Sequence, residues 1–311
     1  MLKRGMVLIA LSTVVSAADP SFNQELADGY EKIVNTIITL TSDDMMSTGR
    51  YKFYDTTTLD TYHLPVKYNF DPFYKGFNFF VNGTISYSKI EEKEYGFNRL
   101  SPDYFDLSLR MYKLGGGLRY KPNDDFYIAM GYSLIYSKYK SNYSSNSKAS
   151  LDAFSKPPLS EITNFLNTTQ SNWTSEFIFS SEYKHEIYGF VPYASAEYKW
   201  YRTRTDLDLE EDVKVTSQNE ILRGKLGSLT PVLFDVYDSG FRLDGFVGRT
   251  YYYGDVVEVL ENRYYDSYGV GGYLDFKSEE GLLDKLGIVS EWVHGEHFKG
   301  YNIGLDLVFN F

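Results

Sequence analysis

Apolar and polar residues alternate with a period of two along most of the chain from Gly49 onward. The last residues show the pattern best: one set consists of Tyr301, Ile303, Leu305, Leu307, Phe309 and Phe311, and the other of Asn302, Gly304, Asp306, Val308 and Asn310. The same alternation recurs over residues 60–70, 76–90 and 125–139. A period of two is typical of β-strands that have one apolar and one polar face. The pattern therefore predicts an all-β structure.

The alternation predicts a specific set of strands. Twelve segments fit it, namely residues 49–57, 60–70, 76–90, 104–120, 125–139, 173–184, 187–204, 217–237, 241–253, 264–276, 286–296 and 300–311. We interpret 217–237 as one strand rather than two that break near Gly227, because alternate residues from Leu222 to Val236 stay in phase. No segment after the N-terminal region has the run of about 18 apolar residues that a membrane-spanning helix needs. We expect an all-β membrane protein: a single 12-stranded antiparallel transmembrane β-barrel with a short N-terminal amphipathic helix.

The lengths of the connections support an even number of strands. The three longest, residues 91–103, 140–172 and 205–216, all follow odd-numbered strands, whereas most connections after even-numbered strands are short. Bacterial barrels have short periplasmic turns and longer outer loops. We therefore expect the barrel in the bacterial outer membrane with both termini in the periplasm.

Composition agrees with a membrane barrel. Aromatic residues make up 18% of the chain, with 30 Tyr and 22 Phe, and amphipathic rings gather at both membrane interfaces of such barrels.

The formal net charge of −11 argues against a nucleic-acid partner, which requires a basic surface. The partners that we expect are outer-membrane lipid and lipopolysaccharide. The chain has no cysteine, so that a disulfide framework is excluded.

The N-terminal region divides into two segments ahead of the barrel at 48–311. Residues 1–18 have a basic start, a short apolar core and small residues at the end, which predicts a secretory signal peptide cleaved after Ala17 or Ala18. Residues 19–47 contain an amphipathic helix and a linker. Within it, 21–41 places apolar residues at helical spacing, and Ser21 with Gln24 fits a capping box. Three alternatives stay open: a helix in the lumen, a helix at the periplasmic rim, or no stable helix.

Few residues suit catalysis. His63, His185, His294 and His297 are the only histidines. His294 and His297, with Glu291 and Glu296 nearby, could bind a metal, but three-residue spacing puts them on opposite faces of a strand. The His-x-Ser-Asn-Gly motif of the outer-membrane phospholipase is absent. Acidic residues that an outer-membrane protease could use lie at a rim, namely Asp206, Asp208, Glu210, Glu211 and Asp212. We expect no enzyme, no metal and no cofactor.

The lumen of the predicted barrel should contain charged side chains. A candidate network consists of Arg110, Arg242, Asp244, Glu291 and Asp306, which the alternation assigns to the lumen face. Twelve strands enclose more space than the eight that side chains alone can fill. Water, a loop or a helix must therefore occupy the centre.

A helix that leads into a twelve-stranded barrel ending in Phe resembles the translocator unit of autotransporters. Residues 19–47 leave no room for a passenger, so that the chain is more similar to the solitary autotransporter-like barrel family. The string Pro192-Tyr193-Ala194 is similar to strands of autotransporter barrels. The terminal strand resembles the C-terminal signal read by the barrel-assembly machinery, which the resemblance implies as a partner. The residues of this candidate assembly signal are Tyr301, Leu307, Phe309 and Phe311.

The resemblance implies a structural or transport barrel whose lumen is occluded by the N-terminal helix. The alternative is a small-solute porin with an open lumen. An outer-membrane hydrolase is disfavoured because the chain lacks the Ser–His motif. The solute, the oligomeric state and the role of the loop at 140–172 stay open.

Overall fold

The computed structural model describes residues 21–41, 48–53, 57–94, 103–145, 152, 167–207, 213–237, 239–276 and 283–309. The predicted signal peptide and most of the loop at 140–172 lie outside these residues.

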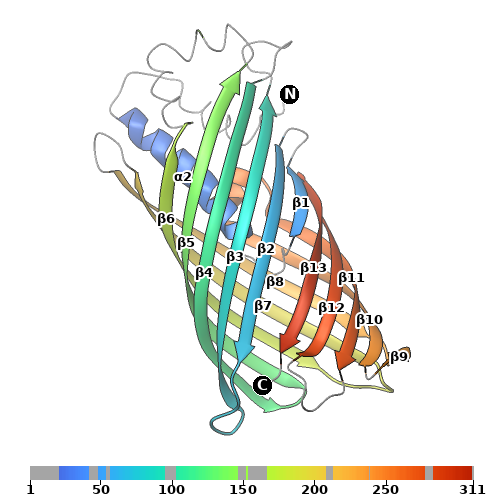
Figure 1. Cartoon of the computed structure of the whole chain (residues 1–311). Helices are drawn as coiled ribbons and strands as arrows, with labels where there is room; N and C mark the ends of the chain where they lie inside the picture. Colours follow the sequence, from blue (N-terminus) through green and yellow to red (C-terminus); the bar gives the residue numbers. More distant parts are fainter. Residues whose placement is uncertain are drawn as a thin grey trace.

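A closed ring of antiparallel strands forms the wall of the molecule (Figure 1). The wall strands are β1 (Thr48–Phe53), β2 (Thr57–Asn69), β3 (Phe77–Glu94), β4 (Asp103–Asn123), β5 (Phe126–Ser145), β6 (Thr169–Lys184), β7 (Val191–Leu207), β8 (Val213–Leu229), β10 (Ser239–Gly254), β11 (Tyr264–Phe276), β12 (Leu283–Gly295) and β13 (Phe298–Phe309). Each pairs with the next, and β1 pairs with β13 to close the ring. Within the described residues this is the predicted twelve-stranded barrel.

The prediction of one continuous strand over 217–237 is wrong. β8 begins earlier, at Val213, and ends at Leu229; a short strand, β9 (Phe234–Val236), then pairs with β10. Leu229 lies opposite Asp244, and Phe234 lies opposite Phe241. The four residues 230–233 therefore lie opposite only two residues of β10, 242 and 243. Pro231 has no N–H for the ladder, which favours a bulge at this place. The two extra residues preserve the alternation, which explains why the sequence pattern looked continuous.

The two ends of the barrel differ. We call the end at which β4 begins, at Asp103, the loop end, and the opposite end, with the turn at Asn123–Phe126, the turn end (Figure 1). β4 has 21 residues and β5 has 20, about twice the 9–11 that cross a bilayer. The strands at 104–120 and 125–139 are therefore longer than predicted.

Strand β1 is much shorter than its neighbours. It pairs with β13 only over Gly49–Phe53 and with β2 over Thr48–Phe53. From His63 to Asn69, β2 pairs with β3 alone among the described residues. Among the described residues, the wall therefore has a discontinuity between β2 and β13 toward the turn end, which we call the seam.

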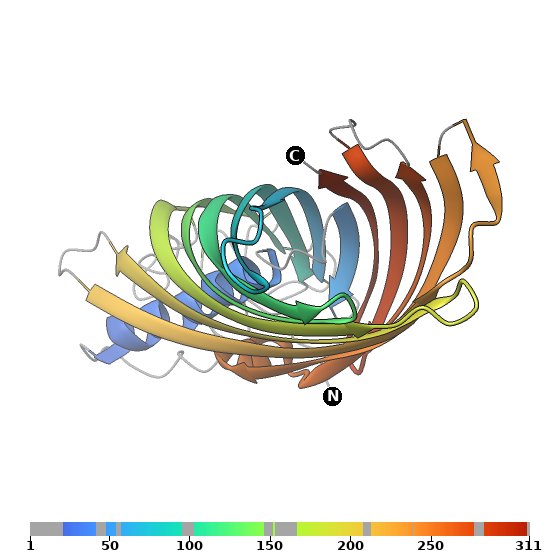
Figure 2. The same ribbon diagram turned by 90° about the horizontal axis from the view of Figure 1, so that it is seen from below.

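Two helices lie at the loop-end side of the ring. The predicted helix is present as α2 (Ser21–Thr41), and Figure 2 shows its C-terminal part within the ring of strands. A second helix, α5 (Asp255–Leu260), lies in the connection that the sequence pattern assigned to an outer loop. Neither has the length and apolar character that a helix needs to cross a membrane. The inside of the barrel therefore contains helical as well as strand residues.

Candidate functional site in the barrel lumen

The loop-end half of the lumen is filled by apolar side chains. On β4, Leu107, Leu109 and Met111 point inward and are at most 1% exposed, whereas the alternate residues face outward. The same inward apolar set continues on other strands. Its members include Tyr51, Leu59, Ile90, Ile135, Tyr139, Tyr201, Ile221, Tyr252 and Val293. Buried apolar side chains thus lie where a wide aqueous pore would have polar walls.

Helix α2 packs into this core. Ile33, Val34, Ile37, Ile38 and Leu40 are at most 4% exposed and belong to the same cluster. The polar residues of this stretch are buried too, because they face the strands rather than water. These are Asn35, Thr36, Thr39 and Thr41. From Ile33 to Thr41 the helix is therefore surrounded by protein on all sides.

Polar side chains of the wall form hydrogen bonds with Asn35 and Thr39 on the polar face of α2. Asn219 of β8 donates a hydrogen bond from Nδ2 to Thr39 Oγ1 at 2.9 Å. Asn35 donates to Ser217 Oγ of β8 and accepts from Thr203 of β7. These contacts meet the requirement that buried polar groups be paired, and they hold the helix in one orientation against β7 and β8.

Helix α5 also packs against α2. Its Val256 and Leu260 are buried in the cluster, and the Val256 amide donates to Asn219 Oδ1 at 2.8 Å. The Lys32 ammonium of α2 lies 2.7 Å from Glu258 of α5. Asn219 therefore contacts both helices. We call α2 residues 31–41, α5 and the surrounding apolar cluster the plug.

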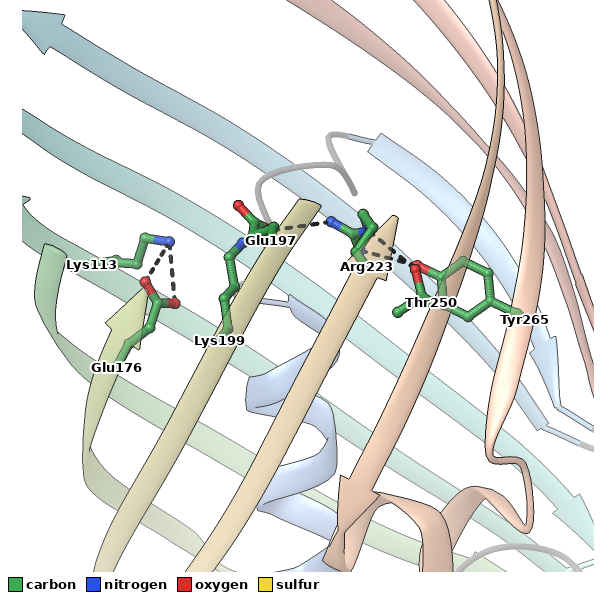
Figure 3. Close-up of polar contacts among 7 residues, drawn as sticks. All are labelled: Lys113, Glu176, Glu197, Lys199, Arg223, Thr250 and Tyr265. Atoms are coloured by element: carbon green, nitrogen blue, oxygen red, sulfur yellow. Dashed lines mark hydrogen bonds and ion pairs between the residues drawn. The ribbon is translucent and has the colours of Figure 1, made fainter. Parts of the chain in front are cut away.

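A belt of charged side chains lies next to the plug on its turn-end side, and Figure 3 shows its residues. Each cation occupies the next inward position after a plug residue: Lys113 follows Met111, and Arg223 follows Ile221. The Lys113 ammonium lies 3.3 Å from Glu176, and neither side chain is exposed.

The rest of the belt centres on Glu197 of β7. Its carboxylate lies 3.1 Å from Lys199 Nζ and 3.5 Å from Arg223 Nη1. The guanidinium of Arg223 also donates to Thr250 and Tyr265, at 3.1 Å each (Figure 3). The belt thus joins β4 and β6 on one side, and β7, β8, β10 and β11 on the other.

Toward the turn end, cations lie over aromatic rings. Arg119 lies 3.9 Å from the ring centre of Tyr127, and Lys285 lies 3.6 Å from that of Tyr273. Lys225 lies 3.5 Å from the ring centre of Phe246. Arg119, Lys225 and Lys285 are partly exposed, so that this half is polar and reached by water, in contrast to the plug.

The residues of the predicted lumen network do not form one network. Arg242 pairs with Asp275 at 2.9 Å. Asp244 accepts from the Tyr193 hydroxyl at 3.0 Å, and Glu291 accepts from Asn302 at 2.8 Å. The side chain of Asp306 lies outside the described residues.

The assignment of Arg110 to the lumen is wrong. Arg110 faces outward between the inward-facing Leu109 and Met111. The physical reason is that the polar pattern reverses toward the loop end. There the outward residues of β4 are polar, whereas its inward residues pack against the plug. Two features of the sequence indicated these inward apolar residues. One is the alternation on β4 of Leu107, Leu109 and Met111 with Asp106, Ser108 and Arg110. The other is the set of valines of α5 within the segment predicted as a loop.

The other candidates are dispersed. Tyr301 faces outward on β13 and is 48% exposed; Phe311 and the side chains of Leu307 and Phe309 lie outside the described residues, so that the assembly signal stays a prediction. His185 lies 2.8 Å from Asp125 at the turn end. The rim acids Asp208, Glu210, Glu211 and Asp212 lie beyond the described part of the chain. Within that part, no group of three or more His, Cys, Asp or Glu could hold a metal ion.

The closed ring, its outward apolar band and the helix in its lumen define a membrane-spanning β-barrel with an internal helix. The family model for the solitary outer membrane autotransporter beta-barrel domain matches residues 31–311. The chain therefore belongs to this family of bacterial outer-membrane barrels, as the sequence resemblance implied. No match was found among curated proteins.

Solved autotransporter barrels have the same fold. The translocator domain of NalP from Neisseria meningitidis has a TM-score of 0.58 at 9% identity, over 99% of this chain and 100% of that chain. The transport unit of AIDA-I from Escherichia coli has a TM-score of 0.56 at 9% identity, over 91% and 98%. The beta domain of the Bordetella autotransporter BrkA has a TM-score of 0.54 at 13% identity, over 83% and 94%. At identities this low, the structural similarity supports the fold alone and does not identify site residues.

Proposed function

We propose that this chain is a transport-type barrel of the autotransporter class whose lumen is occluded at the loop end by the plug. The burial of α2 is the main support for this proposal. Ile37 and Ile38 are 1% and 0% exposed in the loop-end half of the lumen. The family relationship supports the transport class. The burial supports a closed resting state, as opposed to an open porin.

The plug is a strong barrier to ions for a physical reason. An unpaired ion in an apolar region pays a large desolvation penalty. The cations of the belt below are already paired, since Lys113 contacts Glu176, and Lys199 contacts Glu197. Solutes that enter the polar turn-end half therefore meet the apolar cluster, and passage requires α2 to move.

We further propose that the loop end faces the cell exterior and that both termini lie in the periplasm, because short turns are typical of the periplasmic end. The chain has no cysteine, so that single cysteines can report topology. Ser144→Cys at the loop end should react with a membrane-impermeant maleimide on intact cells. Asp71→Cys at the turn end should react only after permeabilisation. The reverse pattern would contradict this orientation.

Planar-bilayer recording tests the occlusion. The full-length chain should give no stable conductance, and a variant that lacks residues 21–41 should conduct. Stable conductance of the full-length chain would contradict the proposal and favour the porin alternative.

A second variant guards against misfolding of the deletion. Val34 and Ile38 lie one turn apart on α2 and are at most 1% exposed. The double variant V34D/I38D introduces two charges into the cluster and should release the helix, since burying unpaired carboxylates is costly. It should conduct, while its heat-dependent gel mobility shows that the barrel is folded. A folded V34D/I38D variant without conductance would contradict the occlusion.

A further inference from the structure

An outward-facing groove lies on the membrane side of the wall, across β2, β3 and β4. It has a volume of about 480 Å³. Its floor is formed by Tyr62 and Leu64 of β2, Ile85 and Tyr87 of β3, and Arg110 and Tyr112 of β4. Thr48, the first residue of β1, also lines it. The groove therefore begins where β1 begins, at the loop-end limit of the seam.

The strand register sorts the groove into two rows. Tyr62, Tyr87 and Arg110 lie opposite one another in the row nearer the loop end. Leu64, Ile85 and Tyr112 form the next row toward the turn end. Leu64 is 62% exposed and Ile85 58% exposed on this outer face. Rings of Tyr typically lie at headgroup level, and aliphatic side chains lie at hydrocarbon level. One end of the groove is thus polar and cationic, and the other is apolar.

Further positive charge lies beside the polar end. Arg110 is directly opposite Lys138 of β5, and Lys140 lies at the next outward position of that strand. All three side chains are exposed, and among the described residues none of them forms an ion pair. Like charges directly opposite each other on one face of a sheet are destabilising. A bound anion would relieve this repulsion.

We propose that this groove binds a lipid A-type molecule, with its phosphates on Arg110 and Lys138 and one acyl chain along Leu64 and Ile85. Arg binds phosphate through two parallel hydrogen bonds, and Lys adds a point charge. Three neighbouring cations fit a headgroup with two phosphates better than the single phosphate of a phospholipid. The lipid would lie in the leaflet at the loop end, which is the outer leaflet in the orientation proposed above.

Native mass spectrometry of the full chain in detergent tests the proposal, with bisphosphorylated lipid A, monophosphorylated lipid A and phosphatidylglycerol as probes. The protein should retain bisphosphorylated lipid A best and phosphatidylglycerol least. The variant R110Q/K138Q should lower the retained bisphosphorylated lipid A by about tenfold, because it removes charge-assisted contacts to phosphate. The matched control R202Q/R204Q, which removes two outward cations of β7, should leave it unchanged.

A second pair of variants tests the apolar end of the groove. Ile85→Trp fills the groove without a change of charge and should also reduce lipid A retention. Its control, Val247→Trp, places the same ring on the outer face of β10. Three results would each overturn the proposal. They are a loss of lipid A from R202Q/R204Q equal to that from R110Q/K138Q, full retention of lipid A by Ile85→Trp, and binding of phosphatidylglycerol equal to that of bisphosphorylated lipid A. Binding in detergent is independent of orientation and of the plug, so that failure here is distinguishable from failure of the proposed function.

Discussion

The ion pair between Lys113 and Glu176 is fully buried inside a barrel that crosses a membrane. Removing two charges from water is costly, and their attraction offsets the cost only while both partners are present. The pair is therefore weak evidence for stability but strong evidence for a specific arrangement of the belt.

Removal of one partner should be more harmful than removal of both. Lys113→Met leaves the Glu176 carboxylate buried without this partner and should lower the free energy of unfolding by about 3–5 kcal/mol. The double variant K113M/E176M should recover most of that loss. Urea titration of the protein folded in lipid vesicles measures both values. Equal destabilisation by the single and the double variant would show that the two side chains are not coupled.

The contacts of single site residues could be predicted only in part. Alternation predicts the inner face for Arg242, Asp244 and Glu291, but partners such as Tyr193 and Asn302 come from other strands. Arg110 was assigned to the wrong face because strict alternation does not show which face of a strand is wet. The wet face depends on which residues fill the barrel, and those residues are distant in the sequence.

At the scale of elements, the strands were more predictable than the helices. Period-two alternation located every wall strand because each has one face toward a different medium. α5 was missed because six residues are too short for a periodic signal. The end of β8 was missed because the bulge at 230–233 preserves the alternation of side chains.

Gly254 should be essential for α5, because its φ of +84° is a conformation that favours glycine. A Cβ at this position would lie 2.3 Å from the carbonyl oxygen of Gln218 on β8. Gly254→Ala should therefore lower the free energy of unfolding by about 1–3 kcal/mol and loosen α5. Gly245→Ala is the matched control, since a Cβ there has no neighbour within 4 Å. Equal unfolding free energies of the two variants would contradict this role.

The docking of α2 depends on its aliphatic side chains. Ile38 is fully buried, and Ile38→Ala should reduce the stability of the docked helix by about 2–5 kcal/mol. Hydrogen exchange of the amides in residues 31–41 should become faster as the helix detaches more often. Ile303→Ala, on the lipid-facing side of β13, should leave this exchange unchanged. Unchanged exchange in Ile38→Ala would show that the cluster does not hold the helix.

At the scale of the whole molecule, the barrel, its strand number and its family could be predicted from alternation, connection lengths and the terminal helix. The position of the helix could not, because an amphipathic pattern is equally compatible with a lumen and a membrane rim. The polar stripe of α2 contains the deciding contacts, since Asn35 meets Thr203 and Ser217 only inside the ring. The proposed occlusion of the lumen rests on that position.

Cross-linking in isolated outer membranes tests whether α2 lies inside the barrel of the native protein. Asn35 contacts Ser217, which faces the lumen, whereas the neighbouring Gln218 is exposed on the outer face. In isolated outer membranes, a short bifunctional thiol reagent should link the N35C/S217C pair and should not link the control pair N35C/Q218C. Absence of a link in N35C/S217C, with both thiols accessible to a monofunctional maleimide, would contradict the plugged barrel.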